Sequence, residues 1–181
     1  STQAGRDAFG TQKFTVLKNS IDVARFRFDA GKRRQLREQL NISEKTFVVG
    51  TVCRYAEQKN PILMIDIVNE ILKINPNTVF LWVGSAPTED DPTWLQMQQR
   101  VQQLGIQAQM RWVGSKADVY NWYSAMDVFL MPSRWEGLGI TYIEAQANSL
   151  PTFASDVVPK DTQITELIRY IPLSCAADVW A

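Results

Sequence analysis

The run TFVVGTVC at residues 46–53 is mostly apolar and rich in β-branched side chains. Such a strand is typical of a parallel sheet that helices cover on both faces. Further segments of strand character follow it, separated by helical segments. The expected strands are 46–53, 78–83, 109–113, 127–131, 151–154 and 169–173, and the expected helices are 61–74, 92–104, 118–123 and 138–149. This alternation indicates βαβ units, and therefore an α/β fold with a Rossmann-like, doubly wound parallel sheet.

Local signals fix several boundaries. Pro61 occupies a favourable first-turn position of its helix, and Asp91 followed by Pro92 indicates an N-cap and the first turn of the next. That helix is expected to end at Gly105, and Asp118 to cap the short third helix. Weaker signals predict a strand at 14–17, a charged helix at 32–40 and a short helix at 164–168. Residues 1–181 are expected to form one domain, with 1–45 less regular than the rest.

Composition excludes several classes of function. The 19 basic and 19 acidic side chains cancel, whereas a nucleic-acid binder usually carries a basic excess, so no nucleic acid is expected as a partner. The chain has no histidine, which excludes a histidine metal site or a Ser-His-Asp triad built from these residues alone. Cys53 and Cys175 are expected to be buried thiols in a reducing compartment. No segment reaches the length of a membrane span, and the N-terminus lacks a signal peptide and is expected not to be a natural start.

Two cations follow the first strong strand. Arg54 comes at its end and Lys59 precedes the helix that Pro61 opens. Ligands of doubly wound sheets bind outside the carboxyl ends of the strands, and a helix N-terminus favours anions. Arginine offers a planar fork for phosphate oxygens, and lysine a mobile point charge. The pair could hold a diphosphate; solvated loop charges are the alternative.

The loop after the strand at 127–131 contains two glycines, Gly137 and Gly139, where the strand gives way to a helix. Glycine permits close approach of the backbone to a ligand. The free N–H groups near Leu138, Gly139 and Ile140 are expected to face an anion. A glycine-rich turn alone is weak support for a phosphate site.

Two acidic residues flank these glycines. Glu136 lies before the helix and Glu144 inside it, with seven residues between them. Carboxylates accept hydrogen bonds from the paired hydroxyls of a ribose or a sugar ring. The alternatives are a surface acid for Glu136 and an exposed helix residue for Glu144. Apolar neighbours indicate a mostly buried helix, in which Glu144 requires a partner. Trp135 and Tyr142 could line a sugar pocket or pack in the core, and both alternatives remain.

Weaker features complete the set. Gly114 and Ser115 follow the strand at 109–113, at the same edge of the sheet, and could equally form an ordinary turn. The acidic residues at 89–91 indicate a helix start rather than a metal site.

The combination resembles the family-four retaining glycosyltransferases of the GT-B fold. Glu136 and Glu144 match the E-x7-E motif within SRWEGLG…EAQA, and Arg54 and Lys59 match the phosphate-binding pair at the family's spacing of five. The runs VG, DV and AMDVF at 113–129 also match, and residues 18–22 are similar to its inter-domain segment. Lysine and serine at 18 and 20 replace the family's proline and glycine, and Ser149 replaces a glycine. The wording at 155–160 is similar to bacterial exopolysaccharide or capsular transferases.

The resemblance implies the C-terminal, donor-binding half of a GT-B enzyme, with the N-terminal acceptor domain and the C-terminal end absent. It assigns catalytic roles to Glu136, Arg54 and Lys59. Glu136 would hold the donor sugar, and Glu144 the ribose. Both cations and the backbone at 137–140 would hold the diphosphate, and Gly114 and Ser115 the base. It implies no metal and no cofactor, with a nucleotide sugar, expected to be a UDP-sugar, as substrate.

The same resemblance implies a saccharide or lipid-linked acceptor bound through the missing domain. It places the protein in the cytoplasm, with peripheral association at the inner face of the membrane as an open possibility. A nucleotide-sugar epimerase of the same fold and a non-catalytic nucleotide-binding α/β module remain alternatives. A flavodoxin-like receiver domain is disfavoured, because cations rather than acids stand at the strand ends.

Overall fold

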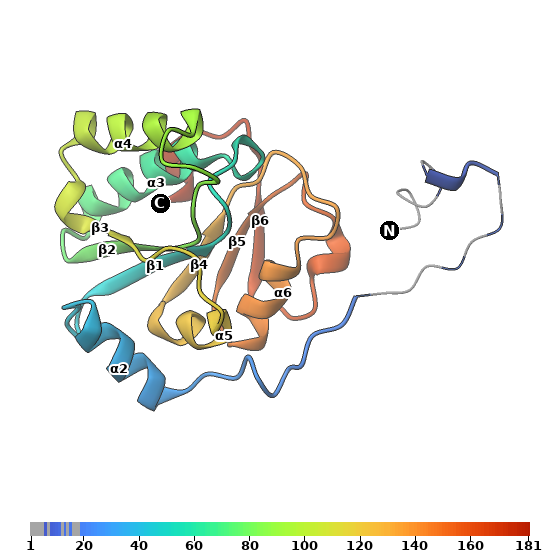
Figure 1. The fold of residues 1–181 in the computed structure, drawn as a ribbon, viewed down its shortest axis with the longest axis horizontal. Helices are drawn as coiled ribbons and strands as arrows, with labels where there is room; N and C mark the ends of the chain where they lie inside the picture. The colour runs from blue at the N-terminus through green and yellow to red at the C-terminus, as the bar shows by residue number, and fades with distance from the viewer. Residues whose placement is uncertain (1–5, 7, 12, 14, 16–18) are drawn as a thin grey trace.

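The computed structural model describes residues 6, 8–11, 13, 15 and 19–181. Its centre is a six-stranded sheet in the order β3-β2-β1-β4-β5-β6, in which every pairing is parallel (Figure 1). The strands are β1 (Phe47–Val52), β2 (Thr78–Val83), β3 (Met110–Trp112), β4 (Val128–Met131), β5 (Thr152–Ser155) and β6 (Ile168–Ile171). The doubly wound parallel sheet predicted from the sequence is confirmed, with each strand within two residues of its expected ends.

Strand order reverses between β1 and β4. From β1 the chain proceeds outward to β2 and β3, and from β4 it proceeds outward in the opposite direction to β5 and β6. In doubly wound folds the ligand crevice lies at such a switch point, between the loops that follow the two central strands. Here those loops are residues 53–60 and 132–139.

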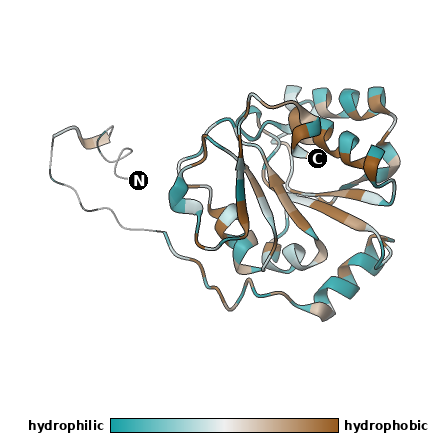
Figure 2. Cartoon of the chain, turned by 180° about the vertical axis from the view of Figure 1, so that it is seen from behind, coloured by the Kyte–Doolittle hydropathy of each residue, from teal (hydrophilic) through white to brown (hydrophobic). Residues whose placement is uncertain are grey.

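Helices cover both faces of the sheet (Figures 1 and 2). The longer ones are α2 (Ala30–Gln39), α3 (Pro61–Ile74), α4 (Pro92–Leu104) and α6 (Ile140–Ala147), and α5 (Val119–Trp122) and α7 (Ala177–Trp180) are single turns. The 3-10 turns are η1 (Glu57–Lys59), η2 (Gln107–Gln109), η3 (Tyr123–Ala125) and η4 (Lys160–Thr162). Helices α3, α4 and α7 pack together on one face, and α2, α5 and α6 lie on the other. Among the described residues no helix is long and apolar enough to cross a bilayer.

Alternate residues of each central strand enter two separate cores. In β2, Leu81 contributes to the core under α2, α5 and α6, whereas Phe80 and Trp82 contribute to the core under α3 and α4. All three side chains are fully buried. Burial of a large apolar side chain contributes roughly 1.5–3 kcal/mol, so this alternation is the main source of stability.

The predicted end signals of α4 are confirmed. The Asp91 carboxylate accepts from the backbone N–H of Trp94 at 3.0 Å, Pro92 is the first residue, and Gly105 ends the helix at φ 70°. Asp118 precedes α5 as predicted but makes no side-chain bond to the helix backbone. Its carboxylate instead accepts from the side chains of Asn121 and Trp122, so this part of the prediction was wrong.

Residues 164–168 do not form the predicted helix. They make a turn and then enter β6 at Ile168. The buried Gln146 side chain on α6 accepts from the backbone N–H groups of Ile164 and Thr165. These bonds satisfy the backbone without helical pairing. Of the predicted strand at 14–17, all but residue 15 lies outside the described residues.

The charged helix predicted at 32–40 is α2, and its charges anchor it to the sheet. Arg37 is 1% exposed, and its guanidinium donates to Asp127 Oδ2 at 2.8 Å and to the carbonyl oxygen of Ala125 at 3.0 Å. Arg33 donates to the other oxygen of Asp127 at 2.7 Å. Asp127 also accepts from the backbone N–H of Val48 in β1, which joins the helix to the start of both central strands.

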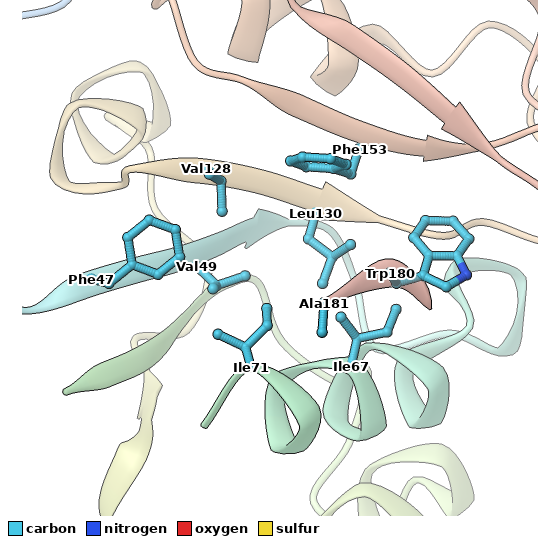
Figure 3. Close-up of a pocket in the computed structure, with 9 residues that line it drawn as sticks. All are labelled: Phe47, Val49, Ile67, Ile71, Val128, Leu130, Phe153, Trp180 and Ala181. Carbon is cyan, nitrogen blue, oxygen red and sulfur yellow. The ribbon is translucent and has the colours of Figure 1, made fainter. Parts of the chain in front are cut away.

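An apolar cavity of about 130 Å³ lies between the sheet and α3, away from the crevice (Figure 3). Its lining side chains are those of Phe47, Val49, Ile67, Ile71, Val128, Leu130, Phe153, Trp180 and Ala181. None of these side chains carries a charge, so the cavity does not suit an anionic ligand.

Candidate functional site

The loops after β1 and β4 are joined by an ion pair across the crevice. Lys59 Nζ lies 2.6 Å from Glu136 Oε1, although the residues are 77 positions apart in the sequence. The side chains are 16% and 5% exposed. Ser133 donates to the same carboxylate oxygen at 2.7 Å. Glu136 is therefore a buried, partnered acid, and the surface reading of this residue is wrong.

Local structure sets the position of Lys59. The residue ends the 3-10 turn η1, Asn60 follows with φ 56°, and Pro61 begins α3. The left-handed conformation at Asn60 turns the chain sharply between the two helices. This turn places the ammonium group at the beginning of α3, beside the crevice.

Gln58 links the two loops a second time, and the sequence analysis missed it. Its side-chain amide donates to the Trp135 carbonyl oxygen at 2.9 Å, and the backbone carbonyl oxygen of Gln58 accepts from the Arg134 backbone N–H at 2.8 Å. The amide nitrogen also lies 3.4 Å from Glu136 Oε2. The only sequence signal for a role of Gln58 in the site was its position next to Lys59, in a loop at the end of a strand. Ser133 was missed in the same way, since its role depends on the fold of the β4 loop.

Arg54 differs from Lys59 in having its side chain free. It is exposed at the end of β1, and the described part of the chain offers it no ion pair or hydrogen bond. The edge of the crevice thus presents one cation that is engaged by a carboxylate and one that faces solvent.

Glycine is required at the start of α6. Gly139 adopts φ 77° as the N-cap, and a Cβ there would lie 2.6 Å from the ring of Tyr142. Because glycine has no side chain, the first N–H groups of α6 receive no capping acceptor from it. Leu138 and Ile140 flank this position as predicted. Gly137, in contrast, has open space where its Cβ would be.

Glu144 lies on α6 and is held by a buried phenol. The Tyr123 hydroxyl donates to Glu144 Oε2 at 2.6 Å. Burial raises the pKa of Glu144, whereas the hydrogen bond from Tyr123 lowers it. Burial, together with the neighbouring carboxylate, raises the pKa of Tyr123 well above its usual value. Glu144 has the partner that the sequence analysis required of it, but nothing in the sequence identified Tyr123.

Gly114 and Ser115 lie two strands away from β1 at the same edge. Gly84, which follows β2, donates to the Gly114 carbonyl oxygen at 3.0 Å, and the hydroxyls of Ser85 and Ser115 are 2.9 Å apart. These contacts align the loops after β2 and β3. The predicted residues therefore occupy one continuous edge, from β3 to β4.

The two aromatic residues left open by the sequence have different positions. Tyr142 is fully buried and donates to the Met131 carbonyl oxygen at 2.7 Å, so it belongs to the core. Trp135 is 55% exposed beside the crevice. Cys53 and Cys175 are free, and each residue as a whole is partly exposed. The Cys53 thiol itself is buried, so the expectation of buried thiols is corrected for Cys175 alone.

The described residues offer no cluster of metal ligands. They contain no group of three or more cysteine, aspartate or glutamate side chains placed to hold a metal ion. The acidic residues at 89–91 include the N-cap Asp91, as expected for a helix start.

The sequence matches a known family. Residues 32–167 match the family model described as Glycosyl transferases group 1. The lipopolysaccharide core biosynthesis mannosyltransferase LpsB of Rhizobium meliloti is 30% identical over 166 residues, which cover 91% of this chain and 46% of that protein. An Escherichia coli UDP-Gal:alpha-D-GlcNAc-diphosphoundecaprenol alpha-1,3-galactosyltransferase is 29% identical over 80% of this chain and 37% of its own length. The chain thus spans less than half the length of these curated relatives.

Solved structures show the same fold. HepE of Anabaena, in complex with UDP and glucose, superposes with a TM-score of 0.81 at 22% identity, over 97% of this chain and 49% of that one. WaaG, a glycosyltransferase involved in lipopolysaccharide biosynthesis, gives a TM-score of 0.81 at 19% identity, over 98% and 48%. In both cases the chain corresponds to about half of a larger structure.

Proposed function

Because this chain belongs to the glycosyl transferases group 1 family, we propose that it is the donor-binding domain of a retaining, metal-independent glycosyltransferase. One observation carries the proposal: the ion pair between Lys59 and Glu136 stands at the switch point of the sheet, where doubly wound folds bind their ligands. A charged pair at this edge suits a ligand that offers both phosphate and hydroxyl groups.

The diphosphate of the donor binds the cations of the crevice. Arg54 is exposed and free to form a bidentate contact, and Lys59 supplies a second positive charge from the start of α3. The beginning of α6 adds backbone N–H groups that no side chain caps. Gly137 and its open surroundings allow the donor to approach the backbone closely.

The carboxylates and the outer loops bind the rest of the donor. Glu136 accepts from the sugar hydroxyls through Oε2, which neither Lys59 nor Ser133 contacts and which receives one long hydrogen bond, 3.4 Å, from the Gln58 amide. Glu144 accepts from the ribose, and the backbone at Gly114 and Ser115 lies against the base. These roles follow the family resemblance. The placement of Glu136, Gly114 and Ser115 at one edge, with Glu144 on the helix that begins there, supports them.

Transfer then depends on electrostatic stabilisation of the leaving group. The bond between the anomeric carbon and the β-phosphate oxygen breaks, and its electron pair passes to the phosphate. The acceptor hydroxyl passes its proton to the departing phosphate oxygen and forms the new bond on the same face of the sugar. Arg54, Lys59 and the α6 N-terminus stabilise the negative charge that develops, in the way that preorganised dipoles do in other enzymes. No metal or cofactor is required for this step.

The acceptor is a saccharide or a lipid-linked sugar that binds the remainder of the full-length protein. The printed names of the relatives support this class, since LpsB acts in lipopolysaccharide core biosynthesis and the Escherichia coli relative acts on a diphosphoundecaprenol-linked sugar. A cytoplasmic protein that associates peripherally with the inner face of the membrane fits such acceptors.

Calorimetric titration of UDP, GDP and ADP into this chain without metal tests the proposal. Relatives are named for both UDP-Gal and GDP-mannose, so the comparison identifies the nucleotide. We expect selective binding that the Arg54→Ala/Lys59→Ala variant loses. If neither the folded chain nor the full-length protein binds a nucleotide, the donor site is refuted. Binding without sugar transfer by the full-length protein would favour a non-catalytic module, and an altered donor sugar would favour an epimerase.

A further inference from the structure

Tyr123 has a buried ring and a hydroxyl that forms a hydrogen bond with a carboxylate. Its hydroxyl donates to Glu144 Oε2 at 2.6 Å, from the 3-10 turn η3 to the middle of α6. The ring itself is fully buried. Oε1 of Glu144, by contrast, accepts no hydrogen bond from the described residues.

The phenol is fixed in position by the core around it. The ring of Phe26 lies 5.9 Å from that of Tyr123 in an edge-to-face arrangement at 62°, and the ring of Phe129 lies 5.9 Å away on β4. A ring held between two others cannot turn without disturbing the core. The position of the hydroxyl, and hence of the carboxylate oxygen bound to it, is therefore set by the packing of this face.

We propose that Tyr123 is the positioning residue for Glu144: it fixes Oε2 and leaves Oε1 as the acceptor for the ribose hydroxyls of the nucleotide. This inference rests on the proposed donor site. The same hydrogen bond lowers the pKa of Glu144 against the effect of burial, which favours the ionised form that accepts two hydroxyl donors. Tyr123 never touches the nucleotide; it acts through the carboxylate.

The proposal predicts a specific effect on ribose recognition. A group that positions Glu144 matters only when the nucleotide carries the hydroxyls that Glu144 binds. Loss of the Tyr123 hydroxyl should therefore weaken UDP but leave 2′,3′-dideoxy-UDP almost unaffected. A purely structural role would weaken both nucleotides equally.

Tyr123→Phe tests this, with Tyr142→Phe as the matched control. Tyr142 is also a fully buried tyrosine, but its hydroxyl donates to a backbone carbonyl oxygen rather than to a carboxylate. In calorimetry on this chain, we expect Tyr123→Phe to weaken UDP by about 10- to 140-fold, the range for one hydrogen bond to a charged group, and dideoxy-UDP by less than about twofold. Tyr142→Phe should preserve the ratio of the two affinities. If the chain binds GDP more tightly than UDP, the same comparison uses GDP and 2′,3′-dideoxy-GDP.

A Glu144→Ala background gives a second test that does not depend on stability. If Tyr123 acts through Glu144, adding Tyr123→Phe to Glu144→Ala should cause no further loss of UDP affinity. An unchanged preference for UDP over dideoxy-UDP in Tyr123→Phe, or an undiminished further loss in the double variant, overturns the inference while leaving the donor site intact. Failure of the unsubstituted chain and the full-length protein to bind any nucleotide overturns both.

Discussion

The Lys59 ammonium and the Glu136 carboxylate form a 2.6 Å ion pair in which neither side chain is more than 16% exposed. Lys73 and Glu70, on α3, form a pair of the same length, but Lys73 is 63% exposed. The first pair is buried and joins two loops, whereas the second is more exposed and lies within one helix, so a buried and an exposed ion pair can be compared within one chain.

Removing one member of the buried pair should destabilise the fold. Lys59→Met and Glu136→Gln each leave the other group without its partner, and we expect each to lower the free energy of unfolding by about 1–3 kcal/mol. The double variant should lose clearly less than the sum of the two. Urea unfolding of the four proteins gives the coupling energy. The same cycle on Lys73 and Glu70 should give no more than about 0.5 kcal/mol, and equal couplings in the two cycles would contradict the prediction.

Arg54 should affect binding without affecting stability. Because it is exposed and has no described partner, Arg54→Ala is expected to change the free energy of unfolding by less than about 0.5 kcal/mol. Loss of a charge-assisted contact with phosphate should weaken binding of the nucleoside diphosphate by tenfold or more, since such a bond contributes about 1.5–3 kcal/mol. Lys73→Ala removes the same charge at the distant end of α3 and should leave binding unchanged. Equal affinities for the Arg54 and Lys73 variants would exclude Arg54 from the site.

The two glycines of the β4 loop should respond differently to alanine. Gly139→Ala places a methyl group 2.6 Å from the Tyr142 ring at a left-handed position, and we expect a loss of about 1–3 kcal/mol in stability. Gly137→Ala meets open space and should fold normally. If the nucleotide approaches the backbone at Gly137, that variant should bind it more weakly. Thermal unfolding and calorimetry separate the two effects, and similar melting temperatures for both variants would contradict the steric argument.

The two thiols should differ in reactivity. Burial raises the pKa of Cys53 to about 12 from an ordinary value of 9.0. The thiolate is the reactive form, so at pH 8 its fraction at Cys53 should be about three orders of magnitude below that of an unperturbed thiol. Iodoacetamide should therefore modify Cys175 first, and labelling of Cys53 should increase only as the pH rises toward 12. Mass spectrometry of the labelled peptides provides the test, and faster labelling of Cys53 at pH 8 would disprove it.

Ser149 offers a stabilising substitution. It adopts φ 66°, a left-handed conformation that favours glycine, and it is exposed after α6. Ser149→Gly should relieve this strain and raise the free energy of unfolding by up to about 1 kcal/mol. Ser149→Ala keeps the strain and serves as the control. Equal stabilities of the glycine and alanine variants would show that the conformation carries no strain.

Much of the sheet could be predicted because buried parallel strands have a distinctive composition. The runs at β1 and β2 are apolar on both faces, and Asp91, Pro92 and Gly105 mark the ends of α4 through local chemistry. The turn at 164–168 could not be predicted, because it depends on hydrogen bonds that its backbone N–H groups donate to Gln146, 18 and 19 positions away in the sequence. Local propensity contains no information about such a partner.

The residues of the candidate site also fall into those that the local sequence indicates and those that depend on distant partners. Arg54, Lys59 and Glu136 could be proposed as site residues from the sequence, because cations and acids at strand ends form a recognisable pattern. Gln58 and Tyr123 were not, since an amide in a loop and a tyrosine in an apolar segment acquire their roles only when the β1 and β4 loops, or η3 and α6, come together. The direct contact between Lys59 and Glu136 also depends on strand order, which the separate motifs do not specify.

The reversal of strand order between β1 and β4 also divides the chain into two continuous blocks. One block contributes β1, β2 and β3, and the other contributes β4, β5 and β6. The seam between them pairs two residues of each strand, whereas β1 and β2 pair over six. A molecule that binds both Lys59 and Glu136 would connect the two blocks through the loops that follow β1 and β4. Its binding should therefore slow amide hydrogen exchange in both blocks together, because it contacts a loop of each.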